Sequence, residues 1–206
     1  MSRLQQAVRV RPGGRSERVR RDVARVCLDL LGEGRLDFGP GEVATRSRVS
    51  RATVHRWWPT KDDLLREALT LHTSVLEMPD TGSWAGDLRA LAGQLAAFFS
   101  DPTEVAQNAL MASGAHPDYT RAVLDHYAPL FAGWRHVVER AQARGEVRSE
   151  VDPDDVVLML GSPLLVLPLV IRRTPTAAEV ARLVDLVLTA TARPPLDPRP
   201  ETGPGR

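Results

Sequence analysis

Apolar residues recur at intervals of three and four along most of the chain, which is the spacing of one face of an α-helix. The first such stripe contains Val19, Val23 and Leu30. It predicts a helix over about residues 16–32, with Ser16 as its N-cap. No alternating apolar and polar run typical of a strand occurs, so the pattern predicts an all-α protein.

The same spacing, together with capping residues and prolines, predicts eight further helices. A third helix is expected to start at its cap Ser50 and a fourth at its cap Thr60. Pro129 is expected to kink the long seventh helix. Apart from the short third helix, the expected ranges are about 42–47, 60–78, 83–99, 103–112, 118–144, 155–172 and 176–192.

The two ends of the chain differ from this helical pattern. Residues 1–14 contain few apolar side chains and end in Pro-Gly-Gly, which predicts a flexible basic arm. Residues 193–206 contain five prolines and two glycines, which predicts a disordered tail.

Charge is distributed unevenly along the 206 residues, although the formal net charge is only +1. Residues 1–72 contain 15 Arg and Lys against 9 Asp and Glu, which gives +6, and the remainder contains 12 against 17, which gives −5. A basic first third joined to an acidic remainder favours a polyanionic partner for the first third only.

Other features narrow the class of protein by what they lack. Cys27 is the only cysteine, which excludes an intramolecular disulfide or a cysteine zinc site. His126 and His136 do not have metal-ligand spacing, so no metal and no cofactor is expected. The N-terminus has no apolar core of a signal peptide, and the apolar run 156–171 is short and interrupted by prolines. A cytoplasmic protein without a membrane span is therefore expected.

The most informative segment, residues 43–65, has the sequence VATRSRVSRATVHRWWPTKDDLL. Two short helical patterns flank a tight turn, and the second is rich in hydrogen-bond donors and poor in carboxylates. The second helical pattern ends at Trp-Trp-Pro, just before the N-cap of the fourth helix. This arrangement is typical of the helix-turn-helix of DNA-binding proteins.

These residues resemble the signature of tetracycline-repressor-type (TetR-like) regulators. Arg48 stands where that family usually has a turn glycine, and His55 replaces its usual tyrosine. The resemblance implies a DNA-binding domain over residues 15–60 and a helical ligand-binding and dimerisation domain over 61–192. The matching positions are Val43, Ala44, Val49, Ser50, Thr53, Trp58, Lys61 and Leu64.

Candidate DNA contacts lie on and around the third helix. Arg51, near its N-terminus, is suited to a guanine edge, and Lys61 at the start of the fourth helix is suited to a phosphate. Trp58 is expected to fill the core between the first and fourth helices. The predicted DNA-binding set is Thr45, Arg46, Ser50, Arg51, Ala52, Thr53, His55, Arg56, Trp57 and Lys61.

The remaining helices carry the predicted effector pocket and dimer interface. The penultimate helix is apolar around its circumference, so a partner subunit is the natural cover for it. Predicted pocket residues, which are also compatible with plain core, are Phe98, Phe99, Met111, Tyr127, Trp134 and Met159. Predicted dimerisation residues are Leu164, Leu165, Val180, Leu183, Val184 and Val187.

The favoured function is a ligand-responsive transcriptional regulator, most often a repressor in such families, that binds an inverted repeat of double-stranded DNA as a homodimer. Its effector would be a small molecule that the sequence does not identify. A DNA-binding co-regulatory or architectural protein without a ligand is the alternative. An enzyme is disfavoured, because no phosphate loop, carboxylate pair or Ser-His-Asp order occurs.

Overall fold

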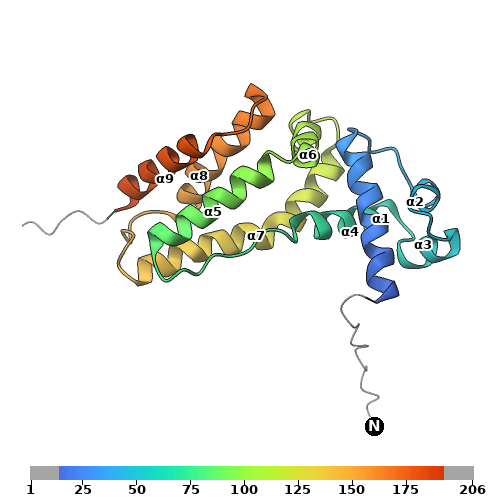
Figure 1. Ribbon diagram of the computed structural model, residues 1–206, viewed down its shortest axis with the longest axis horizontal. Helices are drawn as coiled ribbons and strands as arrows, with labels where there is room; N and C mark the ends of the chain where they lie inside the picture. Colours follow the sequence, from blue (N-terminus) through green and yellow to red (C-terminus); the bar gives the residue numbers. More distant parts are fainter. Residues whose placement is uncertain (1–13, 193–206) are drawn as a thin grey trace, which may run out of the picture.

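The computed structural model describes residues 14–192, and the predicted all-α fold is confirmed (Figure 1). Within this range there are nine α-helices and one π-helical segment, and the only β-pairing is an isolated bridge between Val147 and Ala192. The predicted basic arm and proline-rich tail fall almost entirely outside the described residues.

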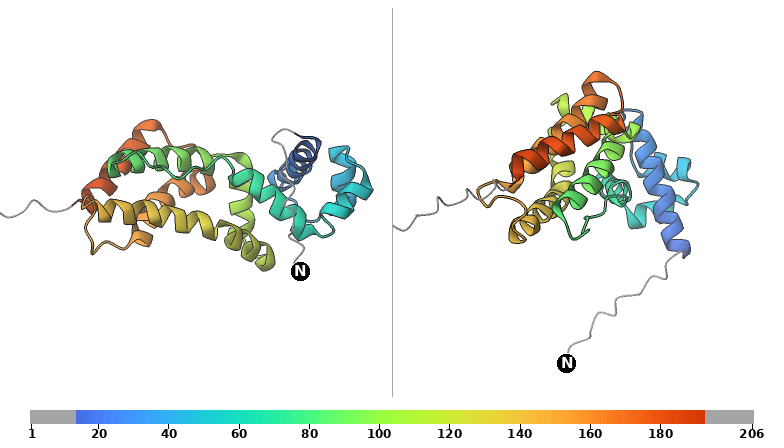
Figure 2. Two further views of the ribbon diagram at one scale, coloured as in Figure 1. Left: turned by 90° about the horizontal axis from the view of Figure 1, so that it is seen from below. Right: turned by 60° about the vertical axis from the view of Figure 1, so that its left-hand side comes forward.

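The N-terminal unit, helices α1 to α3, forms one end of an elongated molecule (Figure 2). Its core side chains, among them Val23, Val43 and Val54, have no exposed surface. Helix α4 packs along α1 and runs from this unit toward the rest of the chain (Figure 1). The four helices are α1 Arg15–Gly32, α2 Pro40–Ser47, α3 Arg51–Trp57 and α4 Lys61–Thr73.

The body, helices α5 to α9, has its own core, in which α5 and α7 face α8 and α9. Trp84, Leu88 and Trp134 are buried there with Leu160 of the penultimate helix. Its elements are α5 Trp84–Phe99, α6 Pro102–Ala112, α7 Pro117–Ala143, α8 Pro153–Val166, η1 Leu167–Ile171 and α9 Ala177–Thr191.

Local side-chain caps explain where most helices begin. Thr60 accepts a hydrogen bond from the Asp63 amide, and the Asp63 carboxylate accepts one from the Thr60 amide, so both residues cap α4. Thr176 and Glu179 repeat this capping box at α9. The predicted caps Ser50 and Thr60 are confirmed, and Asp152 caps α8.

Several predicted helix ends were wrong, among them one each in the first, fourth and penultimate helices. The first helix begins at Arg15, with Gly14 rather than Ser16 as N-cap. The fourth ends at Thr73 instead of continuing to residue 78, because Ser74 closes its last turn. The penultimate helix stops being α-helical at Val166 and widens into η1, where Pro168 lacks the amide that the α-helical pattern requires.

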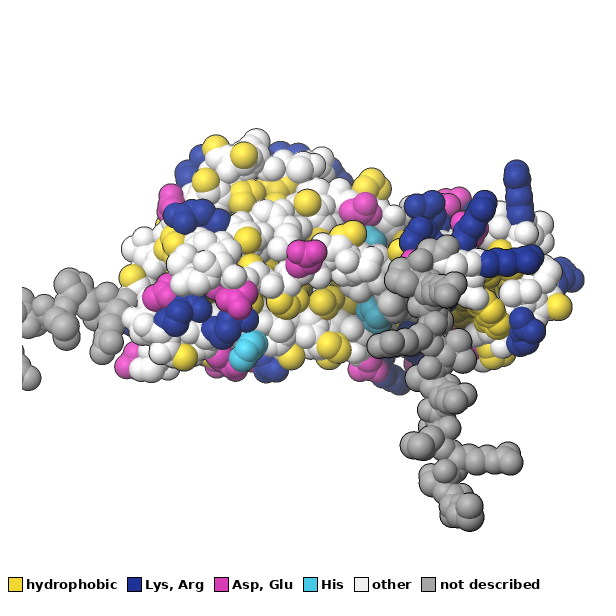
Figure 3. All heavy atoms as spheres, turned by 60° about the horizontal axis from the view of Figure 1, so that its bottom comes forward, with side chains coloured by type: hydrophobic (Ala, Val, Ile, Leu, Met, Phe, Trp, Pro, Cys, Tyr) yellow, Lys and Arg dark blue, Asp and Glu magenta, His cyan; other side chains and the backbone are white. Residues whose placement is uncertain are grey.

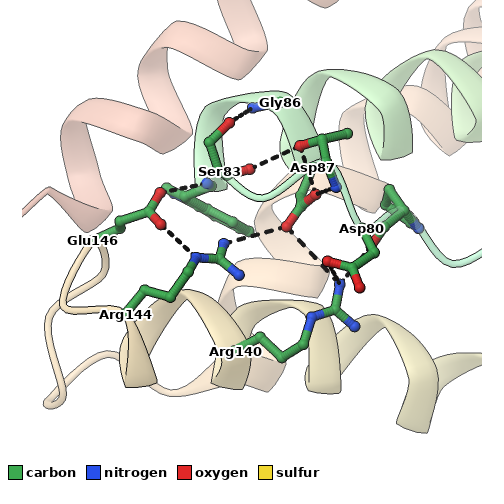
Figure 4. Close-up of polar contacts among 10 residues, drawn as sticks. Asp80, Ser83, Gly86, Asp87, Arg140, Arg144 and Glu146 are labelled. Carbon is green, nitrogen blue, oxygen red and sulfur yellow. Dashed lines mark hydrogen bonds and ion pairs between the residues drawn. The ribbon is translucent and has the colours of Figure 1, made fainter.

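A buried carboxylate, Asp87, joins the first turn of α5 to the C-terminal end of α7 (Figure 4). It accepts hydrogen bonds from the amide and hydroxyl of Thr81 at 2.6 and 2.8 Å, and from Nη2 of Arg144 at 3.3 Å. Burial opposes its ionisation, but these donors outweigh that effect and lower the pKa of Asp87. Arg144 also pairs with Glu146, which accepts from the Trp84 amide. The network joins α5, α7 and the segment just before α5, and it includes no residue of α1 to α4.

Candidate nucleic-acid interface

The turn between α2 and α3 depends on one residue in the left-handed region. Arg48 has φ 58° and ψ 22°, a conformation that glycine adopts without penalty and other residues rarely adopt. The chain then enters α3 through Ser50, whose hydroxyl accepts from the Thr53 amide at 3.2 Å and lies 2.8 Å from the Thr53 hydroxyl. The cap stabilises a helix of only seven residues.

Helix α3 has one buried and one exposed side. Val54 is fully buried, and Val49, before the helix, packs against the same core. Arg51, Ala52, His55 and Arg56 are exposed, while Thr53 and Trp57 are half-buried. Trp57, a member of the predicted DNA-binding set, is only half exposed, and its ring lies edge-on to that of Trp58 with the ring centroids 5.5 Å apart.

The end of α3 is held to both neighbouring helices through one carboxylate. Trp58 is buried, as predicted, and its indole Nε1 donates to Glu67 of α4 at 3.1 Å. Glu67 also accepts two hydrogen bonds from the Arg20 guanidinium of α1, at 2.9 and 3.0 Å. This bidentate ion pair fixes the orientation of α3 on its scaffold.

The arginines of the N-terminal unit differ in whether a carboxylate of the protein pairs with them. Arg48, Arg51 and Arg56 are exposed and form no ion pair with the described residues. Arg46, in contrast, pairs with Glu42 one helical turn earlier at 3.6 Å and with Glu33 at 3.2 Å. The pairing with Glu33 spans 13 residues, and no local sequence pattern indicates it. Figure 3 shows several Lys and Arg side chains at the end formed by the N-terminal helices.

Lys61 is exposed, and its ammonium donates to the carbonyl of Leu36 at 2.9 Å. An ammonium has three donors, so this contact holds the charge at the surface and leaves donors free. Thr45 uses its hydroxyl within α2, donating to the Gly41 carbonyl. A Cβ at Gly41 would lie 3.4 Å from Nη2 of Arg51, which places that guanidinium beside the first turn of α2.

Arg48 is the residue at this surface that the predicted DNA-binding set omitted. It is exposed and lies between α2 and α3. The sequence singled out Arg48 because it replaces the usual turn glycine of the family. It did not indicate that the charged side chain forms part of this surface.

Four of the six predicted pocket residues lie in or against one core, and the other two lie elsewhere. Phe98 and Tyr127 belong to the core shared with the N-terminal unit, with Phe99 and Met111 half-buried against it, whereas Trp134 lies in the body core. Met159 of α8 is 42% exposed and belongs to neither core, so its place in a pocket stays a prediction. One cavity, of about 640 Å³, lies instead between α1, α3 and α4 against Trp57 and Trp58, and another, of about 470 Å³, between α5 and α9.

The predicted dimerisation residues divide by burial. Leu164, Val184 and Val187 are buried in the chain's own core, so their assignment to a subunit interface was wrong, while Leu165, Val180 and Leu183 are half-buried. The outward faces of the same elements carry Leu158, Met159, Val166, Val170, Ile171 and Leu186. A helix that is apolar all round does not reveal from its sequence which side faces its own core.

Within residues 14–192, no group of three or more His, Cys, Asp or Glu side chains has an arrangement that holds a metal ion. One segment, Pro153–Ile171, is long and apolar enough to cross a membrane by length and composition, a test that core helices of soluble proteins also pass.

Comparison with known proteins defines the class. Residues 78–187, more than half of the chain, match the family model of the tetracyclin repressor-like C-terminal domain. The chain is 30% identical over 142 residues to the HTH-type transcriptional regulator AqdR of Rhodococcus erythropolis, covering 68% of each protein. It is 29% identical to the DNA-binding transcriptional repressor TetR of Mycobacteroides abscessus, covering 80% of this chain and 88% of that protein.

Among solved structures, the TetR family transcription regulator SCO0332 superposes with a TM-score of 0.66 at 26% identity, covering 85% of this chain and 99% of that one. The chain therefore belongs to the TetR family. It is a transcriptional regulator with an N-terminal helix-turn-helix, formed by α2 and α3, and not an enzyme. In helix-turn-helix proteins the second helix of the motif is the recognition helix, and α3 occupies that position here.

Proposed function

We propose that this regulator is a homodimeric repressor that binds an inverted-repeat operator through the recognition helix and releases it when a small molecule binds the body. The observation that carries the proposal is the outer face of that helix. Arg51, His55 and Arg56 are exposed there, and the two arginines form no ion pair with the described residues. Cations that the protein leaves uncompensated are available to a polyanion.

Individual roles follow from position and chemistry. Arg51 occupies the first turn of the recognition helix, where side chains reach base edges, and its guanidinium is suited to the two acceptors of guanine. Ala52 beside it is suited to a thymine methyl group. The flanking phosphates accept hydrogen bonds from the remaining donors, which are Thr45, Thr53, His55, Arg56, Trp57 and Lys61. Arg46 can contact DNA only while its charge is partly compensated by Glu33 and Glu42.

A second copy of the chain is the proposed cover for the outward face of α8, η1 and α9. Only 22% of the apolar segment Pro153–Ile171 is buried in the single chain, although it contains no charged side chain after Asp155. Leu158 and Leu186 are 66% and 67% exposed. A two-fold interface over this face would bury them and hold two recognition helices at half-sites about 34–36 Å apart.

The effector and the repressing action are inferred from the related proteins. The body matches the C-terminal domain of tetracyclin repressor-like proteins, and the Mycobacteroides relative is named as a repressor. Both observations favour release of DNA by a small molecule over a co-regulatory protein without a ligand. The effector must bind the DNA-incompetent state more tightly, because equal affinity for both states shifts nothing.

The salt dependence of operator binding tests the DNA-contacting surface. Replacing Lys61 with alanine removes one proposed phosphate contact, so the slope of log K against log salt should fall by roughly 0.9 per subunit, or about twice that per dimer. Arg121→Ala is the matched control, because Arg121 is an exposed cation of α7 in the body. Equal slopes for the wild type and Lys61→Ala would remove Lys61 from the interface.

A further inference from the structure

A second buried carboxylate, Glu104 of α6, has only 1% of its surface exposed and is surrounded by donors. Its Oε2 atom lies 2.9 Å from Nε2 of His72 and accepts from the Tyr127 hydroxyl at 3.0 Å and from Gln107 at 3.4 Å. Its Oε1 atom accepts from Asn108 at 2.8 Å. Tyr119 extends the network by donating to Gln107.

The donors come from different parts of the molecule. His72 lies in the last turn of α4, the helix that leaves the N-terminal unit, whereas Tyr119 and Tyr127 come from α7 of the body. The His72 ring also packs against Phe98 of α5, with ring centroids 4.8 Å apart. Next to it, Thr73 lies 3.3 Å from Nε2 of His126. Glu104 therefore joins α4, α6 and α7 in the region where the N-terminal unit meets the body.

The hydrogen bonds to Glu104 favour one relative arrangement of α4, α6 and α7. Apolar packing tolerates small shifts, but a buried carboxylate that loses a donor retains a desolvated charge, so the network stabilises one relative position of the three helices. The other buried carboxylate, Asp87, has a comparable set of donors, yet they come from the C-terminal end of α7 and from Thr81, just before α5, and none comes from α1 to α4. The two carboxylates thus have matched burial and different locations.

We propose that Glu104 is the positioning residue that fixes α4, and with it the recognition helix, relative to the body. The inference rests on the proposed function for its consequence, which is operator binding by correctly spaced recognition helices. A ligand that moves α6 or α7 has to break the Glu104 contacts before the N-terminal unit can move. Weakening the network releases that unit without any ligand.

Glu104→Gln tests this directly. The amide keeps the size of the side chain but presents one acceptor and one donor group to a site that contains four donors. The distance between dyes on Ala52→Cys of the recognition helix and Ala132→Cys of α7, both exposed sites, should become longer or more broadly distributed. Cys27 is buried, and burial raises the pKa of its thiol to about 12, so labelling is confined to the introduced cysteines. Operator affinity should fall roughly tenfold.

Asp87→Asn is the matched control, which should lower thermal stability but leave the dye distance and operator affinity unchanged. Tyr127→Phe removes a single donor and keeps the ring, so it should shift the distance in the same direction by less, even if Glu104→Gln does not fold. An unchanged distance in Tyr127→Phe and Glu104→Gln, with stability lost as in Asp87→Asn, would overturn the inference. Because the distance is measured within one chain without DNA, a wild type that binds no operator would refute the proposed function alone.

Discussion

At the scale of single residues, Arg48 shows a conflict between the chain and its local geometry. Its left-handed conformation costs a non-glycine residue about 1 kcal/mol relative to glycine. Arg48→Gly should therefore raise the free energy of unfolding by roughly 1 kcal/mol. Denaturant unfolding measures this difference.

Arg48→Ala provides the control, because it removes the same side chain and retains the Cβ that causes the strain. Alanine should give no gain in stability. If the two variants unfold at the same denaturant concentration, the left-handed turn does not store strain. Any loss of DNA affinity common to both variants reports the charge of Arg48 rather than its backbone.

Prediction from the sequence succeeded at residues whose role is set locally. Ser50 and Thr60 cap helices three residues from their partners, and Trp58 is buried at the spacing that the helical pattern requires. The pairing of Arg46 with Glu33 was not predictable, because it depends on how α1 and α2 meet in space. The same holds for Glu104, whose donors His72 and Tyr127 are distant in sequence.

At the scale of elements, the start of α9 is held by an ion pair that responds to pH. Arg173 donates two hydrogen bonds to Glu179, and Thr176 adds backbone and side-chain donors, which together lower the pKa of Glu179 to about 2. A depressed pKa means that the contribution to stability is present above the ordinary value of 4.5 and is lost as the pH falls toward 2.

Arg173→Gln should raise the pKa of Glu179 toward its ordinary value, because it removes the Arg173 hydrogen bonds that contribute most to the lowered pKa. The carboxyl carbon of Glu179, followed by NMR from about pH 6 downward, reports the titration. Thr189→Ala, an exposed change at the other end of α9, should leave the titration unchanged. A titration at the ordinary pKa in the wild type would show that the ion pair does not form in solution.

The sequence predicted the existence and order of the helices but not the orientation of the last two. Spacing of apolar residues identifies a buried face only where polar residues mark the opposite one. Helix α9 has such polar residues, but α8 contains no charged residue after Asp155. The sequence therefore could not distinguish Leu164, which is buried, from Leu158, which is exposed.

At the scale of the whole molecule, the outward apolar face of α8, η1 and α9 is the proposed subunit interface. Leu158→Glu combined with Leu186→Glu would place like charges across the proposed two-fold axis, where desolvation and repulsion both oppose association. The double variant should sediment as a monomer and lose operator affinity, while its far-ultraviolet circular dichroism stays helical.

Val75→Glu is the control, since Val75 is 68% exposed but follows α4, away from that face. It should remain dimeric. A dimeric Leu158→Glu, Leu186→Glu protein with normal operator affinity would place the subunit interface elsewhere.

The central claim is that two copies of the recognition helix bind a symmetric DNA site. Selection of the purified wild-type protein against randomised duplex DNA, repeated with Arg51→Ala, tests it most directly. We predict an inverted repeat whose half-sites lie about one DNA turn apart, and a loss of preference at one symmetric position per half-site in the variant, corresponding to roughly 1–3 kcal/mol of discrimination. An enriched site without two-fold symmetry, or the same preference for both proteins, would contradict the account.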